Sequence, residues 1–217
     1  MPWPTTDEDG FGPADVTRLT GVSRETLSRI EHYLALLDTW RERINLIGPG
    51  EGRHLWRRHV LDSAQLIEEI SDEDKRVADL GSGAGFPGLV LACAAAERPG
   101  VTVTLVEKSV RKSEFLAAVI EGVGLPAEVL NVRLEEAPHQ KFDLVTARAL
   151  APLPKLLGFA ASWLKPSGKA LLMKGRDTAA ELAEARAAWD FDMSARESLS
   201  SPEGRVLKVS LLRTRRA

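Results

Sequence analysis

A glycine-rich turn between two apolar runs constrains this chain more than any other feature, and it spans Asp79–Gly85 (DLGSGAG). The apolar residues from Val77 predict a strand before the turn, and an alanine-rich stretch predicts a helix after it. The next apolar run, 101–106, is followed by Glu107. A strand, a glycine turn, a helix, a second strand and a terminal acid together predict a nucleotide-shaped ligand across a parallel sheet, with the acid on the ribose hydroxyls.

The residues around the turn bear on which nucleotide binds. The segment from Gly83 to Gly88 also satisfies G-x-G-x-x-G, the dinucleotide fingerprint. However, Asp79 would repel a pyrophosphate, and Pro87 removes an N–H at the helix start where a pyrophosphate needs donors. S-adenosylmethionine, with a sulfonium and a zwitterionic tail, suits Asp79 better. The D-x-G-x-G-x-G order with a downstream acid is typical of class I methyltransferases. A dinucleotide, or a turn without a ligand, remains an alternative.

Composition limits the remaining possibilities. The 217 residues can bury one good core, and a net charge of −2 means that nucleic-acid binding would need a local basic patch. The single cysteine, Cys93, excludes an internal disulfide framework, and the four histidines lack metal-ligand spacing, so we expect no metal. The chain contains neither a membrane-length apolar run nor a signal-peptide pattern. We therefore expect a cytoplasmic protein without membrane contact, and a monomer.

The order of predicted elements indicates an α/β fold. Residues 1–22 are expected to form a flexible leader, and 23–72 a helical appendage with an amphipathic helix over 24–47 and a second helix over 51–70. Residues 73–217 should form a Rossmann-like, doubly wound sheet. Its predicted strands are 76–80, 101–106, 127–132, 142–147 and 169–174, followed by an antiparallel pair near 190–195 and 206–212. The predicted helices between them are 87–97, 109–122, 153–164 and 177–188.

The fourth strand end bears on the type of reaction, because in class I methyltransferases it faces the acceptor atom. Amine methylation usually uses an acidic or amide residue followed by Pro-Pro-aromatic, and the sequence at 146–149 has none. Pyrimidine C5 methylation needs a cysteine, and Cys93 lies within a predicted helix. The remaining acceptors are an oxygen or an already nucleophilic atom such as guanine N7. Arg148 could hold guanine O6 or a phosphate, or could be a surface arginine.

A basic stretch precedes the sheet, with three arginines and two histidines over 53–59. It is either a solvated helix with a local ion pair or an RNA-phosphate patch beside the cofactor cleft. Lys174 and Arg176 could extend such a patch, or could simply be solvated. Asn45 is either a helix C-cap or a functional residue.

The chain resembles the bacterial glucose-inhibited division protein B family, also called ribosomal RNA small subunit methyltransferase G, over about residues 24–213. The resemblance rests on the order and combination of several motifs, of which no single one is specific. These are Asn45-Leu46, Arg58–Ser63, Asp79–Gly88, Val106-Glu107, Lys112–Leu116, Asn131–Glu136, Val145–Ala149, Ala151–Leu153 and Lys174-Gly175.

The resemblance implies transfer of a methyl group from S-adenosylmethionine to N7 of one guanine in small-subunit (16S) ribosomal RNA. The glycine pattern predicts cofactor contacts at Asp79, Gly83 and Gly85, and the resemblance adds Gly81, Phe86, Glu107, Leu134, Glu135 and Arg148. Arg148 and His59 are the expected catalytic residues, with His59 positioning the substrate or supporting the scaffold rather than transferring a proton. The expected RNA-binding residues are Asn45, Arg53, Arg57, Arg58, His59, Asp62, Ser63, Lys174 and Arg176.

Two observations leave alternatives open. Ile47-Gly48 follows Asn45-Leu46 where many family members carry a threonine, which leaves the role of Asn45 undecided. A nicotinamide-dependent oxidoreductase would use the same glycine turn for a different nucleotide. A non-catalytic protein that binds ribosomal RNA would use the basic stretch alone. The expected partner is small-subunit ribosomal RNA or the 30S subunit.

Overall fold

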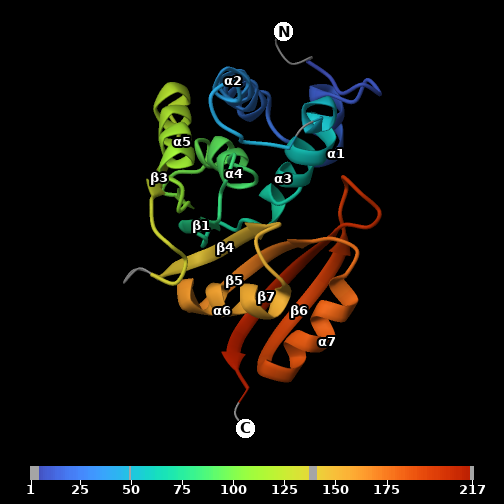
Figure 1. Cartoon of the computed structure of the whole chain (residues 1–217), viewed down its shortest axis with the longest axis vertical. Helices are drawn as coiled ribbons and strands as arrows, with labels where there is room; N and C mark the ends of the chain where they lie inside the picture. Colours follow the sequence, from blue (N-terminus) through green and yellow to red (C-terminus); the bar gives the residue numbers. More distant parts are fainter. Residues whose placement is uncertain (1–4, 49, 137–140, 216–217) are drawn as a thin grey trace.

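The computed structural model describes residues 5–48, 50–136 and 141–215, and they include a seven-stranded sheet in the order β3-β2-β1-β4-β5-β7-β6 (Figure 1). Strands β1 to β5 are parallel, whereas β7 pairs antiparallel with both β5 and β6. The strands are β1 Arg76–Leu80, β2 Thr102–Val106, β3 Ala127–Leu130, β4 Phe142–Arg148, β5 Leu164–Lys174, β6 Trp189–Glu197 and β7 Arg205–Thr214. The predicted doubly wound sheet with an antiparallel last strand is therefore confirmed.

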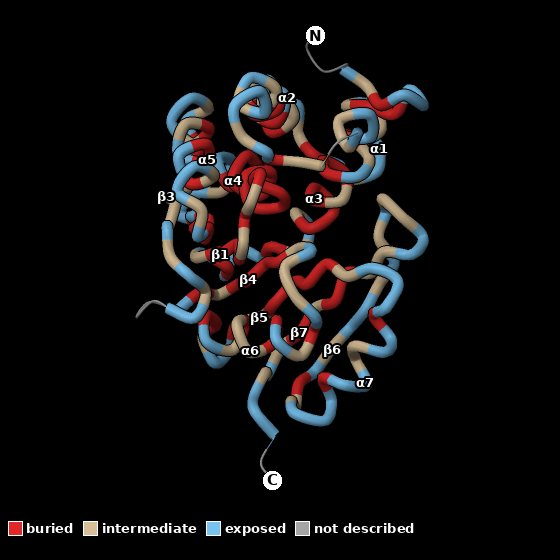
Figure 2. Tube along the Cα trace, in the orientation of Figure 1, coloured by how far each residue is buried: buried red, intermediate tan, exposed pale blue. Residues whose placement is uncertain are grey.

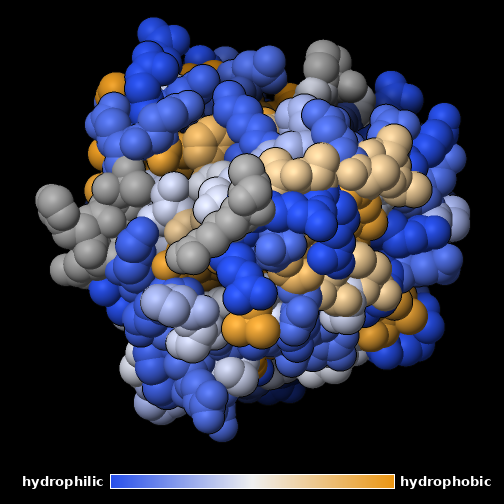
Figure 3. Space-filling model, turned by 90° about the horizontal axis from the view of Figure 1, so that it is seen from below, coloured by the Kyte–Doolittle hydropathy of each residue, from blue (hydrophilic) through white to orange (hydrophobic). Residues whose placement is uncertain are grey.

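Helices cover both faces of this sheet, as a parallel sheet requires. α4 (Gly88–Ala95), α5 (Val110–Val123) and α2 (Arg24–Trp40) lie on one side, while α6 (Leu153–Trp163) and α7 (Thr178–Ala188) lie on the other (Figure 1). All eight residues of α4 are buried, which explains why its sequence is apolar all round rather than amphipathic. Figure 2 shows the buried residues gathered where these helices meet the sheet. The face seen from below in Figure 3 mixes hydrophilic and hydrophobic residues.

The N-terminal helices belong to the same core as the sheet. Tyr33 of α2 is fully buried against Phe86 and Phe115, with ring centroids 5.3 and 6.4 Å away. Its hydroxyl donates a 2.6 Å hydrogen bond to the carbonyl of Ala84 in the glycine turn. The segment that we expected to be an appendage thus packs on the domain that contains the sheet, and the boundaries at 22/23 and 72/73 stay predictions.

The first long helix ends earlier than its periodicity predicted. Ser23 caps it, because its hydroxyl accepts the N–H of Thr26. The helix stops at Trp40, whose carbonyl accepts the N–H of both Arg43 and Ile44 and so closes a turn. Asn45 is therefore not a helix C-cap but an exposed residue of the following loop.

The second predicted helix, 51–70, is divided into four short pieces. These are a 3₁₀ turn at Glu51–His54 (η1), a π-helix at Trp56–Leu61 (η2), a single α-turn at Asp62–Ala64 (α3) and a 3₁₀ turn at Ile67–Glu69 (η3). π-helical segments are rare and are found mostly at functional sites. The prediction of a regular helix was wrong here, and the irregular piece carries part of the family's N-terminal motif.

The segment expected to be a flexible leader also packs on the body of the protein. Residues 1–4 lie outside the described residues, but α1 (Pro13–Thr20) is regular, and Asp7, Phe11 and Val16 are buried.

Cys93 is fully buried in α4, and this burial raises the pKa of its thiol to about 12. None of the helices among the described residues has the length and apolar character that crossing a bilayer demands.

Candidate active site

The glycine turn leaves β1 and bends across the end of β2. Gly81, Gly83 and Gly85 all have positive φ, between 57° and 99°, a region that other residues rarely adopt. A Cβ on Gly85 would also lie 2.3 Å from the side chain of Leu89. The N–H groups of Gly81 and Ser82 both donate to the carbonyl of Val106, which holds the turn against β2.

Glu107 fixes the same turn from the end of β2. Its Oε2 accepts the N–H of Gly83 at 3.0 Å, and its Oε1 accepts the N–H of Ser109 at 2.8 Å. The side chain is largely buried, and the Asn131 amide donates to the Glu107 carbonyl at 2.7 Å. A carboxylate has about four acceptor sites, so two remain for further donors. The arrangement suits an acid that both orders a glycine turn and accepts ribose hydroxyls.

Asp79 lies beneath the turn rather than facing the cavity. It is 1% exposed, and its carboxylate accepts the hydroxyl of Thr146 at 2.8 Å and the N–H of Gly88 at 3.2 Å. Burial raises the pKa of Asp79 to about 6, despite these hydrogen bonds, which lower it. Its direct contacts are with the protein, so its influence on a cofactor would pass through the glycine turn and through its negative charge.

The loop after β3 carries Leu134 and Glu135, two of the expected cofactor contacts. The carbonyl of Leu134 accepts the indole N–H of Trp163 at 3.1 Å, which fixes this residue, while Glu135 is exposed. Neither residue lines the main cavity, and the loop continues into 137–140, outside the described residues. Their expected contact with the cofactor stays a prediction.

Arg148 and His59 are brought together although 89 residues separate them. Arg148, at the end of β4, donates from Nη1 to the carbonyl of Arg58 at 3.0 Å and lies 3.5 Å from an Asp62 carboxylate oxygen. Its Nη2 is 2.8 Å from His59 Nδ1. The guanidinium also lies over the ring of Phe86, 5.5 Å from the centroid. The π-helix thus places a carbonyl and an imidazole beside one guanidinium, and the first residue of α3 adds a carboxylate.

This contact defines the state of His59. A guanidinium can only donate, so Nδ1 accepts and the proton resides on Nε2. Nε2 is buried and points toward Glu51 Oε2 at 3.5 Å, too long for a strong hydrogen bond. Burial, together with the charge of Arg148, lowers the pKa of His59 to about 4. His59 is therefore neutral at pH 7, with its one lone pair directed at Arg148.

Sequence reasoning missed a second set of partners around Asp62. The hairpin between β6 and β7 carries Ser198 and Ser200, whose hydroxyls donate to Asp62 Oδ1 at 2.9 and 2.6 Å. Gln65 donates to the same oxygen at 3.1 Å. No local pattern links these serines to a residue more than 130 positions earlier, so only the fold could reveal the contact.

These groups surround a cavity of about 800 Å³ at the carboxyl ends of the central strands. Its lining combines the glycine turn, Arg148, the π-helix and the β6–β7 hairpin. Its size suits a small-molecule ligand or a nucleotide. Half of the eighteen expected site residues line this cavity, namely Gly81, Gly83, Phe86, Arg148, Arg58, His59, Asp62, Lys174 and Arg176. Asp79, Gly85 and Glu107 lie outside its lining.

The expected RNA-binding residues fall into different environments. Lys174 is 11% exposed and pairs with Glu181 at 2.6 Å, so it is not a solvated lysine. Arg176 is 76% exposed and forms a two-pronged pair with Glu203. Ser63 is fully buried and donates to the carbonyl of His59 at 2.6 Å, which makes it a support for the π-helix.

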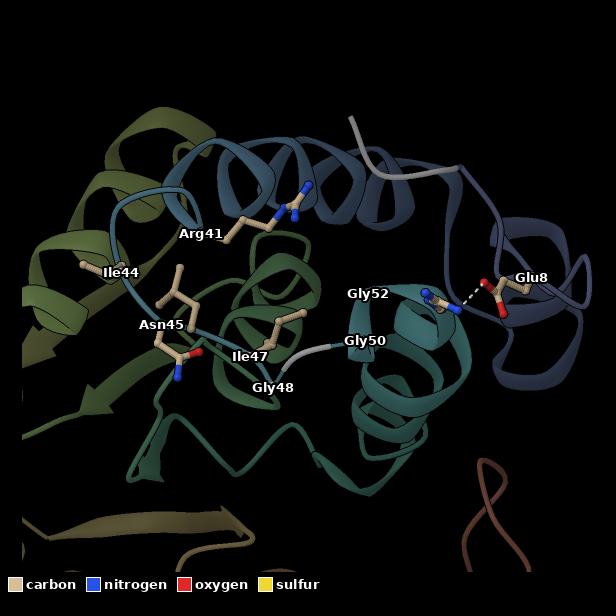
Figure 4. Close-up of a pocket in the computed structure, with 10 residues that line it drawn as sticks. Glu8, Arg41, Ile44, Asn45, Ile47, Gly48, Gly50 and Gly52 are labelled. Atoms are coloured by element: carbon tan, nitrogen blue, oxygen red, sulfur yellow. Dashed lines mark ion pairs between the residues drawn. The ribbon is translucent and has the colours of Figure 1, made fainter. Parts of the chain in front are cut away.

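Arg53, Arg57 and Arg58 all have exposed or half-exposed side chains, as an RNA-phosphate patch requires. Two of them, Arg53 and Arg57, are paired with acids of the N-terminal segment. Asn45 is exposed and lines a smaller neighbouring cavity, which Figure 4 shows in close-up.

The chain is similar in sequence to known proteins over most of its length. The chain is 48% identical to ribosomal RNA small subunit methyltransferase G of Parvibaculum lavamentivorans, over 88% of this chain and 85% of that protein. It is 45% identical to the protein of the same name from Paramagnetospirillum magneticum, over 92% and 95% of the two chains.

Solved structures share the fold at low sequence identity. An O-methyltransferase from Bacillus cereus, in complex with SAH, aligns with a TM-score of 0.57 and 13% identity, over 91% of this chain and 97% of that chain. A ribosomal protein L11 methylase from Lactobacillus delbrueckii aligns with the same TM-score and 20% identity, over 70% and 78%. The fold is thus that of class I methyltransferases. The family model for rRNA small subunit methyltransferase G (GidB) matches residues 26–207, and the chain belongs to this family.

Proposed function

We propose that the protein transfers a methyl group from S-adenosylmethionine to N7 of a specific guanine in small-subunit (16S) ribosomal RNA. Membership of the methyltransferase G family supports the donor and the RNA substrate. The choice of N7 rests on one observation, the contact of Arg148 with His59 Nδ1.

The residues of the glycine turn fit an adenosine and its amino-acid tail. The three positive-φ glycines leave the backbone accessible, and Glu107 retains acceptor sites for two ribose hydroxyls. The bound cofactor would supply an electrophilic methyl group on a positively charged sulfur. Gly81, Gly83 and Phe86 line the cavity and would position that methyl group, and the buried carboxylate of Asp79 would stabilise the positive charge.

The imidazole of His59 is not available as a proton acceptor beside Arg148. The lone pair of His59 is directed at a guanidinium, and its other nitrogen carries a proton, so this residue cannot act as a general base. Guanine N7 has an in-plane lone pair and no proton to lose. In the proposed transfer that lone pair would form the new N–CH₃ bond, and the sulfur would keep the electron pair of the bond that is lost. Positioning then supplies much of the acceleration, on the order of 7–11 kcal/mol for a well-held pair.

Charge at the cavity also suits this reaction. Methylation at N7 gives the purine ring a positive charge, which develops as the N–CH₃ bond forms. The carboxylates of Asp62 and Glu51 line the same cavity and would stabilise that developing charge. Arg148, held by Asp62 and by the Arg58 carbonyl, would hold the O6 edge or a phosphate of the same nucleotide. Arg58, at the cavity, is a candidate for the flanking phosphate.

We further propose that the enzyme acts as a monomer on ribosomal RNA or the 30S subunit, in the cytoplasm. The decisive experiment incubates the protein with methyl-labelled S-adenosylmethionine and small subunits that lack the modification, and then locates the label by mass spectrometry. A single N7-methylguanine is expected. Label on another atom would overturn the N7 assignment. RNA binding without release of S-adenosylhomocysteine would favour a non-catalytic RNA-binding protein. Thermal stabilisation by NAD, without stabilisation by S-adenosylmethionine, would favour an oxidoreductase.

A further inference from the structure

The acidic segment Asp7–Phe11 lies across the basic stretch before the sheet. Asp9 Oδ2 accepts a hydrogen bond from Arg57 Nη2 at 3.0 Å, and the Arg57 guanidinium lies 4.0 Å from the centroid of the Phe11 ring. Glu8 forms an ion pair with Arg53 at 3.4 Å, and its N–H donates to the Arg53 carbonyl at 3.1 Å. Two of the three arginines are therefore neutralised by their own chain.

This arrangement has a fixed anchor. Asp7 is buried, and its two carboxylate oxygens accept the N–H groups of Trp56 and Arg57, both at 2.9 Å. Phe11 is also buried. The backbone of the segment is thereby held on both sides of Glu8 and Asp9, whose side chains remain about half exposed. The anchored backbone thus holds Glu8 and Asp9 beside their arginine partners.

The third arginine, Arg58, lies in a different environment. Arg58 lines the main cavity beside Arg148 and has a long ion pair of 3.9 Å with Glu51. Arg53 instead lines the second cavity, of about 570 Å³, together with its ion-pair partner Glu8. Figure 4 shows Glu8 on the opposite side of this group of residues from Ile44 and Asn45. The two cavities share the wall that contains Ile47 and Gly48. Positive charge is therefore retained at the proposed acceptor cavity and neutralised farther from it.

We propose that Glu8 and Asp9 are specificity-determining residues that suppress binding of non-cognate RNA. RNA that does not present the target guanine can bind only through its backbone, and such binding grows with each arginine available to phosphate. Pairing Arg53 and Arg57 with acids removes two of these contacts. The cognate RNA retains Arg58 and the contacts inside the cavity. This inference rests on the proposed methylation of ribosomal RNA.

The test compares the native protein with a Glu8→Gln, Asp9→Asn double variant, using an oligouridine as the non-cognate RNA. Asparagine keeps an oxygen for the N–H of Phe11, which Asp9 accepts at 3.1 Å, so the fold is preserved. Two freed arginines should steepen the slope of log affinity against log salt by about 1.4. The gain in affinity over the native protein should consequently shrink about 7-fold between 50 and 200 mM salt. The KM for small subunits should change less than the affinity for oligouridine.

Two further variants separate a local effect from a general change of charge. Glu121→Gln with Glu184→Gln alters the net charge equally at exposed positions on α5 and α7, and should leave the salt slope unchanged. Adding Arg53→Gln and Arg57→Gln to the acidic double variant should abolish the gain. Equal slopes for the native protein and the acidic double variant, or a gain that survives loss of the arginines, would overturn the inference. A native protein that methylates no RNA would instead contradict the proposed function.

Discussion

Replacing Glu107 with glutamine tests the assignment of this residue to the cofactor ribose. The carboxylate already accepts N–H groups from Gly83 and Ser109, and it has acceptor sites left for two ribose hydroxyls. Glutamine preserves the shape but removes the charge, and it replaces one acceptor oxygen with an NH₂ group that faces the N–H of Gly83 or of Ser109. A hydrogen bond to a charged group contributes about 1.5–3 kcal/mol, against about 0.5–1.5 kcal/mol for a neutral pair. The hydrogen bonds to two hydroxyls therefore lose about 2–3 kcal/mol of binding free energy, which corresponds to a roughly 30- to 150-fold larger dissociation constant.

Calorimetric titration with S-adenosylhomocysteine measures this loss without turnover. Glu114→Gln is the matched control, because this exposed acid on α5 should leave the affinity unchanged. The circular dichroism spectrum of the Glu107 variant should match that of the native protein, which separates a lost contact from a lost fold. A dissociation constant within threefold of the native value would refute the ribose assignment.

Three further predictions concern the turn and its surroundings. Gly88→Ala would place a methyl group 2.3 Å from a leucine of β2, so thermal unfolding should show a loss of roughly 1–3 kcal/mol in unfolding free energy. Gly175→Ala, with open space around it, is the control and should be neutral in the same assay. Arg148→Met removes a charge that lowers the pKa of His59, and this pKa should rise above about 4 yet remain below 6.5 because burial persists; NMR titration showing no rise would contradict the contact. Asp79 has a folded-state pKa of about 6 against 3.8 when free, so the folded state binds the proton more tightly and stability falls as pH rises between these values. The stability of Asp79→Asn relative to the native protein should therefore increase by about 2 kcal/mol between pH 4 and pH 8, and a constant difference in denaturant melts would exclude a raised pKa.

The sheet and the glycine turn were predictable because they depend on local patterns. Apolar runs of strand length alternated with helical periodicity, and this order alone favours a doubly wound sheet. Glu107 was predictable for the same reason, since it directly follows the second apolar run. The order of motifs also placed Arg148 at the strand end where it is found.

The rest of the site depends on contacts between distant residues, which no local pattern contains. The periodicity of 51–70 favoured a regular helix, but Asp7 binds the N–H groups of Trp56 and Arg57, and the segment forms a π-helix instead. The serines on Asp62 come from a hairpin at the other end of the chain. From the sequence, Lys174 could be a solvated lysine, and only the fold shows that it forms an ion pair with Glu181 of α7.

The packing of Tyr33 on Phe86 and Phe115 has a consequence for how the chain is made. During synthesis α2 is completed well before either phenylalanine has been added, so its apolar face has no partner at that stage. Ile30 and Leu37 of α2 therefore stay exposed to solvent until the ribosome has synthesised α4 and α5. A truncated chain that stops before α5 would expose this face and aggregate, which makes the order of synthesis, and not only the final contacts, part of what the sequence must manage.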